Sequence, residues 1–189
     1  IQDFRYGEPL FNYYAPLPYY LGAAIHFLGF NFITIAKIIF ILITLLSGLG
    51  MYLLAREYWG NWGGILSTLL YLYAPYRALN LYIRGALSES FAFVWFPLIF
   101  WAYHKFFQTT QKQYLILGSV FLALLIFTHN IMALIFLPFV CAFLVFEIYS
   151  TQKLSSLINV FNSIVLGLSL SATFWLPAFL EKQFVQTEK

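Results

Sequence analysis

The chain has 189 residues, of which 62% are hydrophobic, 22% aromatic and only 9% charged, and its mean hydropathy is +0.81. This composition excludes an ordinary soluble domain, in which about 25% of residues are charged. The net charge of +3 is too small and too scattered to indicate nucleic-acid binding. The single cysteine, Cys141, allows no internal disulfide and no cysteine-based metal site. The sequence therefore predicts an all-α integral membrane protein.

Apolar runs separated by short polar turns predict about six transmembrane helices, because one span needs about 20 apolar residues. Residues 1–15 are predicted to form an external loop, and residues 16–30 an interfacial or re-entrant helix that begins at prolines. The predicted spans, within residues 33–177, are Ile33–Ala55, Trp62–Pro75, Leu87–Tyr103, Tyr114–Thr128, Ile131–Tyr149 and Leu157–Pro177. Residues 178–189 would begin a further external segment. Because the chain lacks an initiating Met and opens and closes in polar stretches, we expect a single transmembrane domain cut from a longer protein.

Threading these spans through a bilayer gathers most of the acidic residues on one side, here called side X. Five of the seven lie there, namely Asp3, Glu8, Glu89, Glu181 and Glu188. Lysines and arginines number five on side X and four on the other side, side Y, so the positive-inside rule leaves the orientation open. Ionisable groups near lipid are costly and usually functional. The long mixed-charge loops therefore place the candidate site on side X.

The first candidate group is the pair Asp3 and Glu8 in the N-terminal loop, with Arg5 between them. Two carboxylates on one loop could act as a general base or share a divalent cation. The same spacing fits an interfacial loop whose acids are simply hydrated, because the pattern is not specific. The metal question stays open at this point.

The second group is the segment that leads into the third predicted span, with Arg77, Arg84 and Glu89. An arginine fork matches the oxygens of a phosphate, so both arginines are candidate phosphate ligands. Glu89 would lie in the first turn of a helix, where the helix dipole favours a carboxylate. The alternative is a structural ion pair between Arg84 and Glu89 that locks the loop, and the two interpretations are compatible.

The third candidate is His129, in the tight corner between the fourth and fifth predicted spans. A histidine there could donate to a phosphate or transfer a proton, although the position favours a structural role in which the histidine caps the corner. The other histidines, His26 and His104, share no zinc-binding spacing with it.

Three patches resemble a family of polytopic membrane proteins. The run Tyr6–Leu21 (YGEPLFNYYAPLPYYL) is similar to its most specific signature, and Arg84–Glu89 (RGALSE) and the corner Thr128–His129 resemble two weaker ones. The resemblance covers about residues 2 to 180 of this chain. This family carries the label "6-pyruvoyl-tetrahydropterin synthase-related". That soluble enzyme uses a zinc-binding histidine cluster, and the histidine spacing here does not match it.

The topology of that family is similar to that of the GT-C glycosyltransferases, which take a sugar from a polyprenyl-phosphate carrier at the outer membrane face. The resemblance implies an acidic catalytic residue in the first external loop, for which Asp3 matches best and Glu8 second. It further implies that Arg84 binds the phosphate. In our hypothesis Arg77 and His129 assist Arg84 in binding the phosphate, and Glu89 orients Arg84. In that class a span precedes this loop, and an acid upstream of Ile1 would compete with Asp3 for the catalytic role.

These observations together predict a multi-pass protein of the cell membrane that transfers sugar from a polyprenyl-phosphate donor. A non-catalytic transporter or assembly factor for lipid or polysaccharide is the alternative. Such proteins more often keep charges near the bilayer midplane, whereas here the charges fall at the predicted helix ends. A structural scaffold with interfacial charges is the third interpretation.

Overall fold

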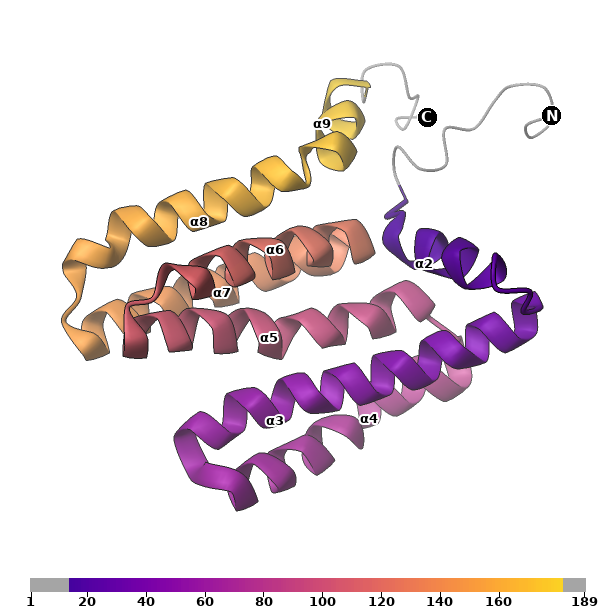
Figure 1. Ribbon diagram of the computed structural model, residues 1–189, viewed down its shortest axis with the longest axis horizontal. Coiled ribbons are helices and arrows are strands. Elements are labelled where there is room, and N and C mark those ends of the chain that lie inside the picture. Colours follow the sequence, from indigo (N-terminus) through magenta and orange to yellow (C-terminus); the bar gives the residue numbers. More distant parts are fainter. Residues whose placement is uncertain (1–13, 182–189) are drawn as a thin grey trace, which may run out of the picture.

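The computed structural model describes residues 14–181, and within this range the protein is all-helical, with helix over 89% of it and no strand. Figure 1 shows the helices running roughly parallel or antiparallel, with the short α2 across one end. The elements are α2 (Leu17–His26), α3 (Phe32–Leu72), α4 (Pro75–Ala78), η2 (Leu79–Arg84), α5 (Leu87–Thr109), α6 (Lys112–Thr128), α7 (Asn130–Thr151), η3 (Leu154–Ser156), α8 (Leu157–Leu170) and α9 (Ala172–Glu181). The helical class predicted from composition is confirmed, and α2 confirms a short helix within residues 16–30.

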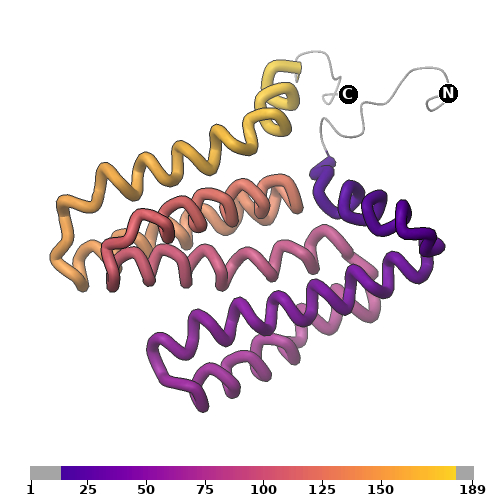
Figure 2. The backbone as a smooth tube through the Cα atoms, in the orientation of Figure 1, coloured from indigo at the N-terminus to yellow at the C-terminus, as the bar shows by residue number. Residues whose placement is uncertain are grey.

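The first two predicted spans are the two arms of α3, which folds back on itself at Gly60 (Figure 2). Gly60 has φ 68° and ψ −173°, a combination that is essentially restricted to glycine. The arms are joined side by side, because Thr68 Oγ1 donates to the Gly48 carbonyl oxygen at 3.3 Å. The hairpin returns the chain to the end at which α3 began, where the candidate residues follow.

The segment between the second and third predicted spans was expected to be a loop, and this was wrong. It forms α4, which begins at Pro75, followed by the π-helical turn η2. Proline suits a first helical position because it has no N–H that would need a partner. The turn ends at Gly85, whose left-handed φ of 58° turns the chain toward α5.

Helix α5 is the centre of the bundle and packs against α3, α6 and α7. Its fully buried side chains include Val94, Ile99, Tyr103 and Phe107. Their burial fixes the axis of α5, and therefore the positions of the residues at both of its ends.

The sixth predicted span, Leu157–Pro177, is broken rather than continuous. Helices α8 and α9 meet at an angle of 69°. At the break, the Ser171 hydroxyl donates to the carbonyl oxygens of Gly167 and Leu168, both at 3.1 Å. Hydroxyl groups that bond back to the preceding turn often bend helices, and here the sequence pattern alone hid the bend.

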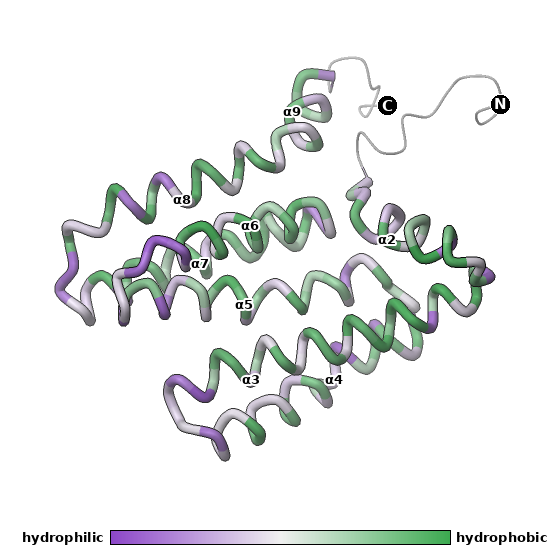
Figure 3. Tube along the Cα trace, in the orientation of Figure 1, coloured by the Kyte–Doolittle hydropathy of each residue, from purple (hydrophilic) through white to green (hydrophobic). Residues whose placement is uncertain are grey.

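Two helices of the described range, α3 and α7, are long and apolar enough to cross a membrane, and the bent pair α8–α9 could form a third span. The prediction of six separate spans is not supported by this count. Many large apolar side chains are exposed, for example Leu45 at 64%, Trp62 at 83% and Leu134 at 72%. Figure 3 shows that hydrophilic residues gather mainly at helix ends and turns. Such extended apolar surface indicates contact with lipid.

Candidate functional site

The structure brings together four of the six predicted site residues at one end of the bundle. Arg77 lies in α4, Arg84 in η2 and Glu89 in the first turn of α5. His129 lies between α6 and α7 and interacts electrostatically with Glu89 and Arg84. The other two predicted residues, Asp3 and Glu8, lie outside residues 14–181.

Glu89 is the centre of a polar cluster at this corner, and it is buried, with 8% of the residue exposed. Oε1 accepts hydrogen bonds from Asn80 Nδ2 at 3.0 Å and from the Tyr76 hydroxyl, and Oε2 lies 2.9 Å from Arg84 Nη1. The hydrogen bonds from Tyr76 and Asn80 and the charge of Arg84 all favour the ionised form of this carboxyl group. Glu89 is therefore an ionised carboxylate held in place.

Arg84 is bound on the protein side by two partners. Besides its ion pair with Glu89, its Nη1 donates to Asn80 Oδ1 at 2.7 Å. The side chain is nevertheless 48% exposed, so part of the guanidinium faces outward. The structural ion pair that the sequence offered as one interpretation is present, and it neutralises the charge of Arg84.

His129 caps the corner between α6 and α7. Its Nδ1 accepts a hydrogen bond from the Met132 backbone N–H at 3.2 Å. The corner is held beside α5, because Trp95 Nε1 donates to Thr128 Oγ1 at 2.8 Å. With Nδ1 occupied as an acceptor, a neutral His129 carries its hydrogen on Nε2 and can donate it.

The charge state of His129 follows from its surroundings. Burial lowers its pKa, and the positive charge of Arg84 acts in the same direction, whereas Glu89 opposes both. The net effect is a pKa below the ordinary value of 6.5, so the ring is neutral at neutral pH. A neutral imidazole at this corner is a hydrogen-bond donor rather than a cation.

Arg77 lies beside this cluster but in a different environment, with only 9% of the residue exposed. Its Nη2 donates to Ser47 Oγ at 2.7 Å, and its guanidinium carbon lies 4.9 Å from the centroid of the Tyr71 ring and 5.2 Å from that of Phe93. No carboxylate oxygen of residues 14–181 lies within 4.0 Å of this guanidinium. Arg77 is a buried cation without a charged partner in the described part of the chain.

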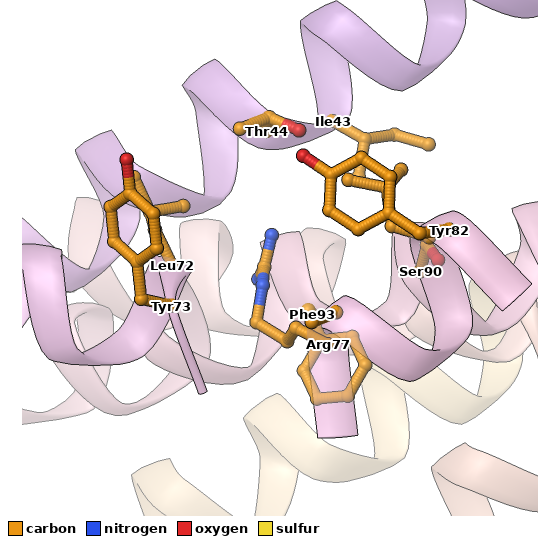
Figure 4. A pocket seen from close by; sticks show the side chains of 10 residues that line it. Ile43, Thr44, Leu72, Tyr73, Arg77, Tyr82, Ser90 and Phe93 are labelled. Carbon is orange, nitrogen blue, oxygen red and sulfur yellow. The ribbon is translucent and has the colours of Figure 1, made fainter. Parts of the chain in front are cut away.

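Arg77 borders a cavity of about 180 Å³ between α3, α4, η2 and α5 (Figure 4). Two of its polar atoms, Arg77 Nη1 and Ser90 Oγ, are buried and have no hydrogen-bond partner. The lining residues are Ile43, Thr44, Leu72, Tyr73, Arg77, Ala78, Leu81, Tyr82, Ser90 and Phe93. The cavity is therefore mainly apolar, with one cation and a few hydroxyl groups.

A second polar cluster lies at the opposite end of α5, and the sequence did not predict it. His104 Nδ1 lies 2.8 Å from Glu147 Oε1, and the Tyr58 hydroxyl donates to the same oxygen at 3.0 Å. Nearby, Lys105 Nζ lies 3.1 Å from Glu57 Oε1, and the cluster borders a cavity of about 470 Å³. One signal could have revealed it, since Glu147 is a single acid within the apolar run Ile131–Tyr149.

The described residues contain no group of three or more His, Cys, Asp or Glu side chains that could hold a metal ion. The predicted divalent cation would depend on Asp3 and Glu8. That hypothesis therefore lies outside residues 14–181 and stays a prediction.

The helical fold, the exposed apolar surface and the apolar helices define an integral membrane protein with a polar corner at one end. The model of the 6-pyruvoyl-tetrahydropterin synthase related domain, a membrane protein family, matches residues 11–188. The chain belongs to this family, and the family resemblance found in the sequence is confirmed.

The chain is also similar to a protein of Lactococcus lactis subsp. cremoris described only as "Uncharacterized protein". The two are 25% identical over 181 residues, which cover 91% of this chain and 30% of that protein. This chain thus spans less than a third of the length of that relative. No solved structure matches the chain.

Proposed function

We propose that this protein is a membrane glycosyltransferase that transfers a sugar from a polyprenyl-phosphate donor at the outer face of the cell membrane. The observation that carries the proposal is the meeting of Arg84, Glu89 and His129, which are far apart in the sequence, at one end of the bundle. The proposal includes a multi-pass GT-C-like architecture of six spans, with the two arms of α3 counted separately.

In the proposed reaction, a hydroxyl of the acceptor attacks the anomeric carbon of the donor sugar. The bond between that carbon and the phosphate oxygen breaks, and the polyprenyl phosphate leaves with the electron pair. Asp3, or Glu8, takes the proton of the attacking hydroxyl. These two residues lie outside the described range, so their part in the proposal depends on the family resemblance alone.

The corner would stabilise the negative charge that develops on the leaving phosphate. Arg84, the Nε2–H of His129 and Arg77 are donors at this end of the bundle, and preorganised donors of this kind lower the barrier. Glu89 acts as a positioning residue, because its ion pair with Arg84 at 2.9 Å holds the guanidinium in one place. The exposed half of Arg84 is the part free to meet a substrate.

The test is a transfer assay on the full-length protein in membranes, with a radiolabelled sugar on a polyprenyl-phosphate carrier. We expect Asp3→Asn and Arg84→Ala to lower kcat/KM by about a hundredfold or more, since each removes a charge that acts in the transition state. Glu181→Gln, which removes an acid elsewhere, serves as the control and should keep wild-type activity. Wild-type transfer by both site variants would overturn the proposal. Carrier binding without transfer would favour the transporter or assembly-factor alternative.

A further inference from the structure

We infer that the cavity beside Arg77 is a binding site for a phosphate oxyanion, and that Arg77 rather than Arg84 is its principal ligand. This inference deepens the proposed function and rests on it only for the idea that the phosphate is carried on a polyprenyl chain. The binding of the oxyanion itself is argued from the geometry of the cavity.

The first argument is the charge of Arg77. An isolated ionised group loses several kcal/mol when it is moved from water into a protein interior. Buried guanidinium groups are therefore usually paired with a carboxylate, but the described contacts of Arg77 are all with neutral side chains, namely Ser47, Tyr71 and Phe93. The ring faces favour a cation without neutralising it. A negatively charged ligand would supply the missing partner.

The second argument is the pair of donors that lack partners. Arg77 Nη1 comes from α4 and Ser90 Oγ from α5, and both are buried at the same cavity. More than nine in ten buried polar groups have a hydrogen-bond partner in folded proteins. Two exceptions at one cavity indicate a ligand with several acceptor oxygens. Figure 4 shows the guanidinium of Arg77 near the middle of the lining residues, where it can meet such a ligand.

The third argument concerns the size and chemistry of the space. About 180 Å³ is far more than the roughly 30 Å³ that one water occupies in the liquid. Tyr82 and Ser90, which carry hydroxyl groups, also line the cavity. A phosphate offers several acceptor oxygens to such a set of donors and binds the arginine fork through two of them. The remaining walls are apolar and suit the first carbons of a chain attached to the phosphate.

Arg84 is the weaker candidate for the same task. Its charge is already paired with Glu89, and its Nη1 also donates to Asn80. A phosphate at Arg84 would compete with a carboxylate 2.9 Å away, whereas at Arg77 it would meet an uncompensated cation. The structure thus reverses the ranking of the two arginines that the sequence indicated.

The experiment measures binding of three probes to the purified full-length protein in detergent: inorganic phosphate, farnesyl monophosphate and farnesol. We expect farnesyl monophosphate to bind, and Arg77→Met to weaken its Kd at least about tenfold, because a hydrogen-bonded charge is lost. Arg77→Lys should weaken binding less, as a point charge lacks the fork. Ser90→Ala should weaken it about threefold. The matched control is Arg56→Met, at an arginine of α3 whose side chain is 45% exposed and that lies outside the cavity, and it should stay within about twofold.

The other probes identify the source of the phosphate. Tighter binding of farnesyl monophosphate than of inorganic phosphate supports a lipid-linked ligand, and equal binding supports free phosphate, both with the site at Arg77. Binding of farnesol as tight as that of its phosphate would overturn the inference. So would an Arg77→Met or Arg77→Lys variant that binds as the wild type does. If Arg77→Met fails to fold, Arg77→Lys and Ser90→Ala provide the same decision.

The binding result and the proposed function can fail separately. Arg77-dependent phosphate binding without sugar transfer would leave this inference intact and contradict the transferase. Sugar transfer that is unaffected by Arg77→Met would support the transferase and contradict the role of Arg77 as the principal phosphate ligand. No step of the binding assay depends on Asp3 or Glu8.

Discussion

A buried ionisable group lies beside each end of α5, namely Glu147 of α7 and Arg77 of α4, and the surroundings of the two groups differ. At one end Glu147 is 2% exposed and is joined to His104 and Tyr58 by contacts of 2.8 and 3.0 Å. At the other end Arg77 is 9% exposed and, within residues 14–181, has no carboxylate within 4.0 Å. The Glu147 carboxyl group has hydrogen-bond partners within the protein, whereas the Arg77 guanidinium has no carboxylate partner among the described residues.

This difference separates a structural contact from a candidate binding site. The Tyr58–His104–Glu147 cluster joins α3, α5 and α7, and it satisfies the Glu147 carboxylate from within the fold. The Arg77 cavity leaves two donors without partners and can satisfy them only with something added. The Arg84–Glu89 pair is intermediate, because its charges are paired but Arg84 is 48% exposed. Burial without a partner, rather than burial alone, points to a ligand.

The largest effect is expected from His104→Phe, which leaves the buried Glu147 carboxyl group without one of its two described hydrogen-bond partners. Removing one member of a buried pair costs about 3 kcal/mol or more of the free energy of unfolding. The measurement is unfolding of the protein in mixed micelles by titration with sodium dodecyl sulfate. His26→Phe is the matched control, since His26 lies at the end of α2 in an exposed position, and it should change stability by less than about 0.5 kcal/mol.

A double variant, His104→Phe with Glu147→Leu, should recover most of that loss, because the stranded carboxylate is removed as well. If His104→Phe lowered the free energy of unfolding by less than about 1 kcal/mol, the Tyr58–His104–Glu147 cluster would not be an important stabilising contact. The contrast between the two ends would then fail.

An intermediate effect is expected from Glu89→Gln, which keeps an acceptor for Tyr76 and Asn80 but removes the charge that pairs with Arg84. We expect a loss of about 1–2 kcal/mol in the same titration, typical of a hydrogen bond to a charged group. Arg84→Met, at the more exposed partner, should lose less than about 1 kcal/mol. A larger loss for Arg84→Met than for Glu89→Gln would contradict the view that Glu89 organises the corner.

A smaller, pH-dependent effect is expected from His129. Burial keeps the pKa of His129 in the folded protein below its ordinary value of 6.5, so the unfolded chain takes up the proton first as the pH falls. The contribution of His129 to stability is therefore fully present above pH 6.5 and is lost as the pH falls through the folded pKa.

His129→Asn should remove that pH dependence, because asparagine stays neutral and can still cap the first turn of α7. The unfolding free energy of the wild type, measured relative to that of the variant, should decrease as the pH is lowered from 8 to 5. A difference that is flat across this range, or that rises toward acid, would refute the assignment.

The smallest effect is expected from Arg77→Met in the absence of phosphate. The lost bond to Ser47 and the lost ring contacts are offset by removal of an unpaired buried charge, so stability should stay within about 1 kcal/mol of wild type. The titration used for His104→Phe measures this directly. A loss of more than about 2 kcal/mol in the free energy of unfolding would mean that Arg77 stabilises the fold as His104 does. The two ends of α5 would then not differ in the way proposed.

Much of the fold was predictable because hydropathy records which residues must avoid water. The two arms of α3, the corner at His129 and the all-helical class follow from apolar runs and polar turns. The bend between α8 and α9 was not predictable, because Ser171 sits in a continuous apolar run and acts only through its local hydrogen bonds. The π-turn η2 was missed because its six residues, LNLYIR, are too few to show a helical period.

The candidate site was predictable in its residues but not in their roles. Arg77, Arg84, Glu89 and His129 are rare polar residues in an apolar chain, and their rarity, their chemistry and the family resemblance marked them. Composition and residue pattern alone thus establish a helical membrane protein with its charges near the helix ends. Only packing decided that Glu89 pairs with Arg84, that His104 meets Glu147 and that Arg77 is left unpaired. Pairing depends on distances of a few ångströms between separate helices, and periodicity along one helix carries no such information.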